Sequence, residues 1–203
     1  STNNPSVYVC DNASTGLWNV PAATNTGLIT DNQGYMIFVR GDRGIITSNQ
    51  YINAKPTNLR AQGQINTGAV SVTLNTTANT NHVIGNPYPS QLDMHNVALN
   101  GVPFGTSGTY YRWDPKLLGS KNVGGWVSFM KVGANIIPST TSGSSYLSDG
   151  LIESGEAFLV KSPAGSITFA ETDKATSSTT VGIASRPAPS VDQYAILRTD
   201  LAF

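Results

Sequence analysis

The chain has 203 residues, 12 basic and 12 acidic side chains, and a net charge of zero at neutral pH. It is long enough to bury a core, and it has no charge excess with which to bind nucleic acid or an anionic membrane. Disordered chains combine high net charge with few aromatic residues, whereas aromatic residues make up 8% of this chain and recur along it. No apolar stretch reaches the roughly 18 residues needed to cross a bilayer, so we expect no membrane insertion.

Short stretches rich in β-branched and aromatic residues, bounded by Gly, Pro or Asn, predict strands along the chain. They lie at residues 8–10, 33–40, 69–74, 125–130, 157–160, 166–169 and 194–198. In one of them, Val70, Val72 and Leu74 alternate with polar residues. This alternation is typical of a strand with one buried face and one solvated face.

Turns and loops separate these strands. Asn100 and Gly101 form a dipeptide typical of a type I′ hairpin turn. Residues 91–99 come nearest to a helical pattern, and we expect a single helical turn there. Residues 172–190 are polar and contain prolines, which favours a long surface loop. Short strands at regular spacing with frequent turns predict an all-β fold, a β-sandwich or jelly roll.

The sequence of residues 34–47 returns in residues 155–168, with Gly, Val, Gly, Ile and Thr at the same relative positions. Looser similarity surrounds both copies. We therefore predict that residues 1–203 form a single module with internal pseudo-duplication, and that its two related halves span about 1–100 and 101–203.

The repeat also predicts the positions of individual side chains. Trp18 and Trp126 follow equivalent motifs, so we expect both rings to be buried in the core. Phe38 and Leu159 should share an orientation for the same reason. Because an active site normally occurs once, a duplicated unit indicates architecture rather than catalysis.

Residues 82–90, His-Val-Ile-Gly-Asn-Pro-Tyr-Pro-Ser, form the most specific local motif. Two prolines flank Tyr88 and stiffen the backbone. The functional interpretation is a tyrosine held out for ligand stacking, and the structural one, which we favour, is a rigid crossover with Tyr88 packed inward. We expect His82 to cap a strand and His95 to lie in the loop that follows.

No arrangement of residues in the sequence indicates a reaction. The serines Ser90, Ser128 and Ser154 lie outside any nucleophile motif. Glu153 and Glu156 could form a glycosidase pair, but the first repeat copy has other residue types at these places. We interpret them as a solvated strand entry, and we predict no catalytic residue and no enzymatic activity.

Metal and cofactor sites are equally unsupported. The single Cys10 excludes an intrachain disulfide and a multi-cysteine metal site, and we expect it to be a core residue. Residues 11–16 begin like a calcium loop, but Ala13 occupies a ligand position and no Glu follows at the right distance. The sequence leaves a structural calcium ion open as an alternative but does not support one. We predict no cofactor and no metal ligand. The Arg-Gly-Asp of residues 40–42 matches an integrin-binding tripeptide, which we attribute to turn geometry.

Aromatic residues supply the one candidate ligand site, because aromatic rings stack on the flat faces of sugars. Trp113 has no tryptophan at the equivalent place of the other repeat copy, so it is the ring that architecture explains least. The candidate ligand-binding residues are Trp113, Tyr111 and Tyr88.

The motif Gly-Asn-Pro-Tyr-Pro-Ser at residues 85–90, with residues 32–43, 110–115, 124–129 and 152–160, resembles a recurrent module of large secreted Bacteroidetes proteins. In that family the module lies near the C-terminal end, ahead of a sorting domain that the type IX secretion system reads. The resemblance covers nearly the whole chain. It implies export to the cell surface or medium in proteins of which many look like adhesins, and it implies no catalytic residues.

These observations predict a non-enzymatic structural or adhesive module of an extracellular bacterial surface protein. Only 12% of the residues are charged, a composition common in secreted bacterial β proteins. The alternative is a carbohydrate-binding accessory module of a secreted glycan-degrading enzyme. A row of exposed Trp and Tyr would favour the binding module, and buried rings would favour the structural one.

The expected partners are other domains of the same polypeptide, neighbouring subunits or surface glycans, with no nucleic acid. We interpret the chain as a fragment of a longer polypeptide, because its first residues look like an internal cut. We expect residues 194–203 to pair in the main sheet.

Overall fold

The structure is a computed structural model that describes residues 5–12, 14–23, 26–38, 62–74, 80–115, 117, 124–139, 150–162 and 164–176. The predicted strand at 194–198, the tripeptide at 40–42 and most of the first repeat copy lie outside these residues. The described residues form fourteen strands and one short 3-10 turn, η1 (Glu171–Asp173), so the all-β prediction is confirmed. In this part of the chain, no helix is long and apolar enough to cross a membrane.

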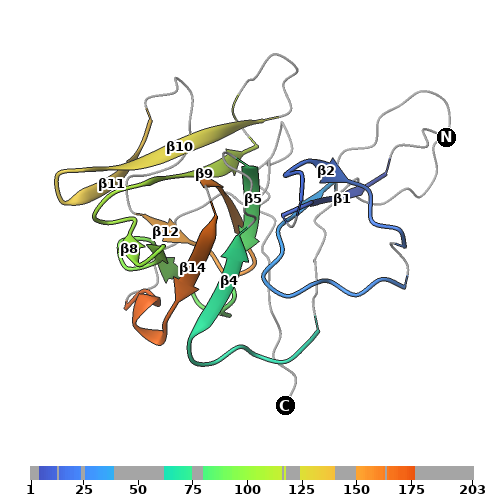
Figure 1. Ribbon diagram of the computed structural model, residues 1–203, viewed down its shortest axis with the longest axis horizontal. Coiled ribbons are helices and arrows are strands. Elements are labelled where there is room, and N and C mark those ends of the chain that lie inside the picture. The colour runs from blue at the N-terminus through green and yellow to red at the C-terminus, as the bar shows by residue number, and fades with distance from the viewer. Residues whose placement is uncertain are drawn as a thin grey trace, which may run out of the picture.

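The largest sheet, here called the main sheet, has five antiparallel strands in the order β11-β10-β9-β13-β5 (Figure 1). Its strands are β5 (Thr80–Gly85), β9 (Thr109–Asp114), β10 (Gly125–Val132), β11 (Asn135–Pro138) and β13 (Ala157–Ser162). The strand β13 lies between β9 and β5 and pairs with both.

The second sheet has four strands in the order β4-β14-β7-β8, and a two-stranded ladder accompanies it. The strands are β4 (Val70–Leu74), β7 (Ala98–Leu99), β8 (Val102–Pro103) and β14 (Gly165–Phe169), and the ladder joins β6 (Leu92–Asp93) to β12 (Leu151–Ile152). In β4 the apolar residues are buried or half-buried and the polar ones are exposed, so the predicted alternation is confirmed.

The two sheets pack face to face as a β-sandwich over one hydrophobic core. Buried side chains from both sheets fill it, among them Phe129 and Phe158 from the main sheet and Phe169 from the second. Tyr110 stacks on Phe129 with a ring-centroid distance of 5.2 Å. It meets Phe104 edge to face at 5.5 Å. Each such ring pair adds about 0.5–1.5 kcal/mol to the stabilisation from burial.

Two local predictions have opposite outcomes. Asn100 and Gly101 have φ angles of 53° and 76° and join β7 to β8, which confirms the two-residue hairpin. The helical turn expected in residues 91–99 is wrong, because this segment contains β6, a turn at 94–96 and β7. The reason is tertiary: the Met94 amide donates to the Gly150 carbonyl, and β7 pairs with β14.

The N-terminal residues 5–38 form a separate three-stranded sheet in the order β2-β1-β3. Its strands are β1 (Val7–Cys10), β2 (Trp18–Asn19) and β3 (Tyr35–Ile37). This N-terminal unit lies beside β5, at the opposite end of the main sheet from β11 (Figure 1). Its apolar surface is large for its size, since Leu28 is 95% exposed and Ile29 is 67% exposed.

The two copies of the repeat differ where both are described. Phe38 is 51% exposed and Leu159 is 6% exposed, so the prediction of a shared orientation is wrong. The neighbours explain the difference, because Leu159 lies in the middle of the main sheet and Phe38 follows the end of the short edge strand β3. Because residues 39–47 lie outside the described part, the pseudo-duplication as a whole stays a prediction.

Candidate functional site

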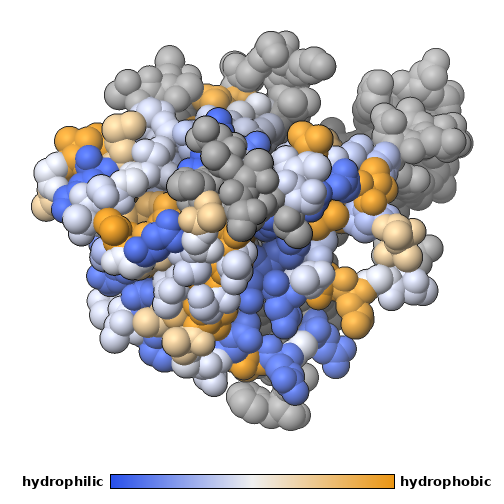
Figure 2. Space-filling view, in the orientation of Figure 1, coloured by the Kyte–Doolittle hydropathy of each residue, from blue (hydrophilic) through white to orange (hydrophobic). Residues whose placement is uncertain are grey.

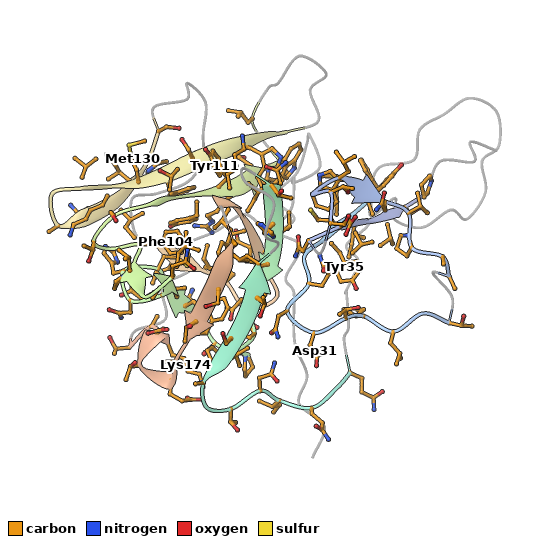
Figure 3. All side chains as sticks on the ribbon, viewed as in Figure 1. Asp31, Tyr35, Phe104, Tyr111, Met130 and Lys174 are labelled. Atoms are coloured by element: carbon orange, nitrogen blue, oxygen red, sulfur yellow. The ribbon has the colours of Figure 1, made fainter. Side chains whose placement is uncertain are left out.

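The candidate ligand site lies on the outer face of the main sheet, the face that points away from the second sheet. Side chains alternate along β9, so Tyr110 and Arg112 point into the core while Tyr111 and Trp113 point outward. Trp126 of β10 stands opposite Trp113 in the strand register. We call Tyr111, Trp113 and Trp126 the outer aromatic cluster, and all three rings are half-buried. Figure 3 labels Tyr111 on β9.

The rings of this cluster do not form a flat platform. Trp113 and Trp126 meet edge to face, with centroids 5.4 Å apart and planes at 79°. The Lys161 ammonium lies 5.5 Å from the centroid of the Tyr111 ring. Trp113 packs against Gly124, where an added Cβ would lie 2.8 Å from the indole Nε1. Packing within the fold therefore accounts for each ring, including Trp113.

Trp18 and Trp126 pack against one small apolar cluster in which Cys10, Val83 and Leu159 are buried. The buried Cys10 confirms the prediction of a core residue, and burial raises the pKa of its thiol. Both tryptophans are half-buried against this cluster, so most of each side chain is inaccessible, as predicted. This cluster lies on the outer face of the main sheet, where solvent reaches part of each ring.

Tyr88 is buried, with 2% of its surface exposed, which confirms the structural interpretation of its motif. Its hydroxyl donates to the Gly68 carbonyl at 2.6 Å, and the Lys174 ammonium lies 4.5 Å from its ring centroid. Burial raises the pKa of this hydroxyl, and the charges of Glu171 and Asp173 raise it further. In this position Tyr88 offers no ring face to a ligand.

Asn86, in the same motif, ties two loops together. Its side-chain amide donates to the carbonyls of Ser90 at 2.8 Å and Glu153 at 3.1 Å. Its side-chain oxygen accepts from the Tyr88 amide at 2.9 Å, and its own backbone amide donates to the Glu156 carbonyl at 2.9 Å. The motif Gly-Asn-Pro-Tyr-Pro-Ser therefore has a structural role, because Asn86 holds the 86–90 loop against the 153–156 turn.

Glu156 forms a buried ion pair with Arg112, so the interpretation of Glu153 and Glu156 as a solvated strand entry is wrong. The Arg112 side chain is fully buried and the Glu156 side chain is 8% exposed. The guanidinium donates from Nε and Nη2 to the two carboxylate oxygens, each at 2.8 Å. The Glu153 amide donates to Glu156 Oε2, and the Glu153 carboxylate accepts from the Gln91 side chain. Both carboxylates hold backbone and side chains in place.

This ion pair is the main feature that sequence reasoning missed. The partners are 44 residues apart in the chain, so no local motif joins them. A signal existed in the alternation of residues 109–114, which places Arg112 on the same face as Tyr110. A buried arginine requires a carboxylate partner, and Glu156 lies at the start of the strand that pairs with β9.

The two histidines occupy different environments. His82 is fully buried inside β5, so the prediction that it caps a strand is wrong. Burial lowers the pKa of its imidazole, and the Asn12 backbone opposes this in part. His95 lies in the turn at 94–96, as expected, with Nδ1 2.6 Å from Asp93 Oδ1. Its backbone amide donates to the same oxygen.

The segment that begins like a calcium loop is a hydrogen-bonded turn. The Asp11 carboxylate accepts from the Ser14 amide and from the amide and hydroxyl of Thr15. Within the described residues, no group of three or more His, Cys, Asp or Glu side chains is placed to hold a metal ion.

The chain matches no protein-family model, no curated protein and no solved structure.

Proposed function

We propose that the chain is a non-enzymatic structural or adhesive module of an extracellular bacterial surface protein. The observation that carries this proposal is the buried network of Arg112, Glu156 and Asn86. Glu156 is a carboxylate that could have formed a glycosidase pair, but it binds Arg112, while Asn86 joins two loops. Together these side chains join the crossover loops to the main sheet, which favours a rigid module over an adaptable active site.

The exposed apolar surface of the N-terminal unit supports the proposal that this module contacts another domain of a larger polypeptide. Leu17, Leu28, Ile29 and Phe38 are each more than half exposed. Figure 2 shows hydrophobic side chains over this part of the molecule. Clustered exposed apolar residues mark contact surfaces in soluble proteins. An adjacent domain of the same polypeptide is the partner that this proposal favours.

Subcellular fractionation tests the extracellular assignment. An antiserum raised against the purified chain should label intact cells of the source bacterium or detect the protein in the medium. The resemblance to proteins exported by type IX secretion favours the surface or the medium over the cell interior. Detection only in the soluble interior fraction would contradict the proposal.

A carbohydrate-binding accessory module is the second candidate, favoured by the outer aromatic cluster. Its three rings are half-buried, so solvent reaches each of them, and Ser128 lies opposite Tyr111 in the strand register. A glycan array probed with the wild-type chain and with Trp113→Ala tests this candidate. Binding that is lost in Trp113→Ala and kept in Phe38→Ala would support it, and no binding by the wild-type chain would exclude it for the glycans displayed.

A further inference from the structure

The N-terminal unit covers the free edge of the main sheet. β5 is the last strand of that sheet, and its edge would otherwise present unpaired backbone groups. The Gly34 amide donates to the Val83 carbonyl at 2.9 Å, and the Gly85 amide donates to the Asn32 carbonyl at 3.1 Å. The Asn12 side chain adds two bonds to Val83, accepting from its amide and donating to its carbonyl, each at 2.8 Å.

The contact between the unit and β5 is tight. A Cβ on Gly34 would lie 2.2 Å from Val83 Cγ1, and a Cβ on Gly16 would lie 2.7 Å from the Asn81 amide nitrogen. The unit itself has little core, since Cys10 is its one buried apolar side chain among the described residues. Its position therefore depends on the edge hydrogen bonds and on close packing against β5.

His82 lies in the middle of this contact. Its side chain is fully buried, and neither ring nitrogen makes a hydrogen bond to the described residues. In the strand register it stands opposite Val160 of β13, which offers no polar group. Interaction with the Asn12 backbone raises the pKa of the imidazole, but the lowering by burial is larger. His82 is thus a buried imidazole between the sandwich and its edge cover.

The charged and titratable groups on the elements around His82 do not neutralise an imidazolium. In the described part of the N-terminal unit these are Tyr8, Cys10, Asp11, Asp31 and Tyr35, and the Asp11 carboxylate is held by Ser14 and Thr15. On β13 the charged residue is Lys161, which lies on the outer face over Tyr111. The facing strands β4 and β14 contain no ionisable side chain.

We propose that the packing of the N-terminal unit on β5 is a pH-sensitive closure, in which protonation of His82 releases residues 7–37 from the edge of the main sheet. A buried imidazolium with only the Asn12 backbone beside it and no carboxylate partner is disfavoured, whereas the open form exposes it to water. Opening would free the edge of β5 for pairing with another extended chain. The proposal does not depend on the function proposed above.

The direction of the pH dependence follows from linkage. Burial lowers the pKa of His82 in the closed form, so the open form binds the proton more readily. Closure is complete above the ordinary histidine pKa of about 6.5 and weakens as the pH falls below it. If the closed form stays neutral, the open population increases up to roughly 30-fold between pH 7.5 and pH 5.

Hydrogen exchange tests the proposal, because the chain has two histidines and the second serves as a control. After correction for the intrinsic pH dependence of exchange, amides of β1 and β3 should open 10- to 30-fold more at pH 5 than at pH 7.5, a range taken from the same linkage. Amides of β9 and β10 should not change. His82→Leu should abolish the dependence, and His95→Gln should keep it.

Three results would overturn the proposal. The first is wild-type exchange in β1 and β3 that does not depend on pH. The second is an equal increase in β9 and β10, which would mean global unfolding. The third is the same increase in His82→Leu. If this variant does not fold, an NMR titration of the wild-type rings decides, because a His82 ring that titrates at about 6.5 while β1 and β3 stay protected would also contradict the proposal.

Discussion

The sandwich and the N-terminal unit are built from similar short strands but are stabilised in different ways. The sandwich buries aromatic and aliphatic side chains from two sheets and adds a buried ion pair. The N-terminal unit exposes six large apolar side chains, and it is held to the main sheet by hydrogen bonds to β5 and by a small apolar cluster around Cys10. Core packing therefore gives the sandwich a stability of its own, whereas the N-terminal unit depends on its neighbour.

The buried ion pair should give the largest effect of the substitutions considered. Glu156→Ala leaves the Arg112 guanidinium buried without its carboxylate, and we expect a loss of about 3–5 kcal/mol in the free energy of unfolding. Urea denaturation measures it. The double variant Arg112→Met, Glu156→Leu is the control and should lose less than Glu156→Ala alone, because no unpaired charge remains. Equal losses in the two variants would show that shape, and not charge, explains the effect.

A matched pair of phenylalanines compares the two regions directly. Phe129 is fully buried and Phe38 is 51% exposed. We expect Phe129→Ala to cost about 3–5 kcal/mol as a large-to-small core change. Phe38→Ala should change the free energy of unfolding by less than about 0.5 kcal/mol. Thermal and urea denaturation of both variants measure this, and similar losses would mean that the N-terminal unit contributes a core of its own.

Asn86→Asp should lower the free energy of unfolding by less, because the new side chain has the same shape as the old one. The substitution replaces an amide donor with an oxygen that faces the Ser90 and Glu153 carbonyls, so we expect a loss of about 1–3 kcal/mol. Asn100→Asp is the milder comparison, because an aspartate keeps the 2.8 Å bond from the Ser166 amide and loses only one long, exposed donor bond, of 3.4 Å to the Ala164 carbonyl. If the two variants lose the same free energy of unfolding, the stabilising role assigned to the Asn86 hydrogen bonds is wrong.

Local patterns predicted local structure well. The alternation in β4 and the Asn100–Gly101 turn depend on neighbours in sequence, and both are confirmed. The helical turn expected at 91–99 is wrong because Met94 bonds to Gly150, far away in the chain. Burial of Tyr88 was predicted from its flanking prolines, but its partner Gly68 could not be.

The repeat shows the limit of reasoning from similar sequences. Gly34 and Gly155 occupy the same place in the two copies but serve different needs. A side chain at Gly34 would clash with Val83, whereas Gly155 has a φ of 74°. The same residue type thus satisfies a packing constraint in one copy and a backbone constraint in the other. Sequence similarity predicted the glycine and not the reason for it.

Native-state hydrogen exchange at increasing denaturant tests most directly whether the N-terminal unit opens apart from the sandwich. We expect the amides of β1 and β3 to exchange through a partial opening whose free energy is lower than the free energy that opens β9, β10 and β13. The β9, β10 and β13 amides should exchange only through global unfolding. If the amides of β1 and β3 required the same free energy and the same denaturant dependence as those of β9 and β10, the chain would unfold as one cooperative unit and the separate edge cover would be contradicted.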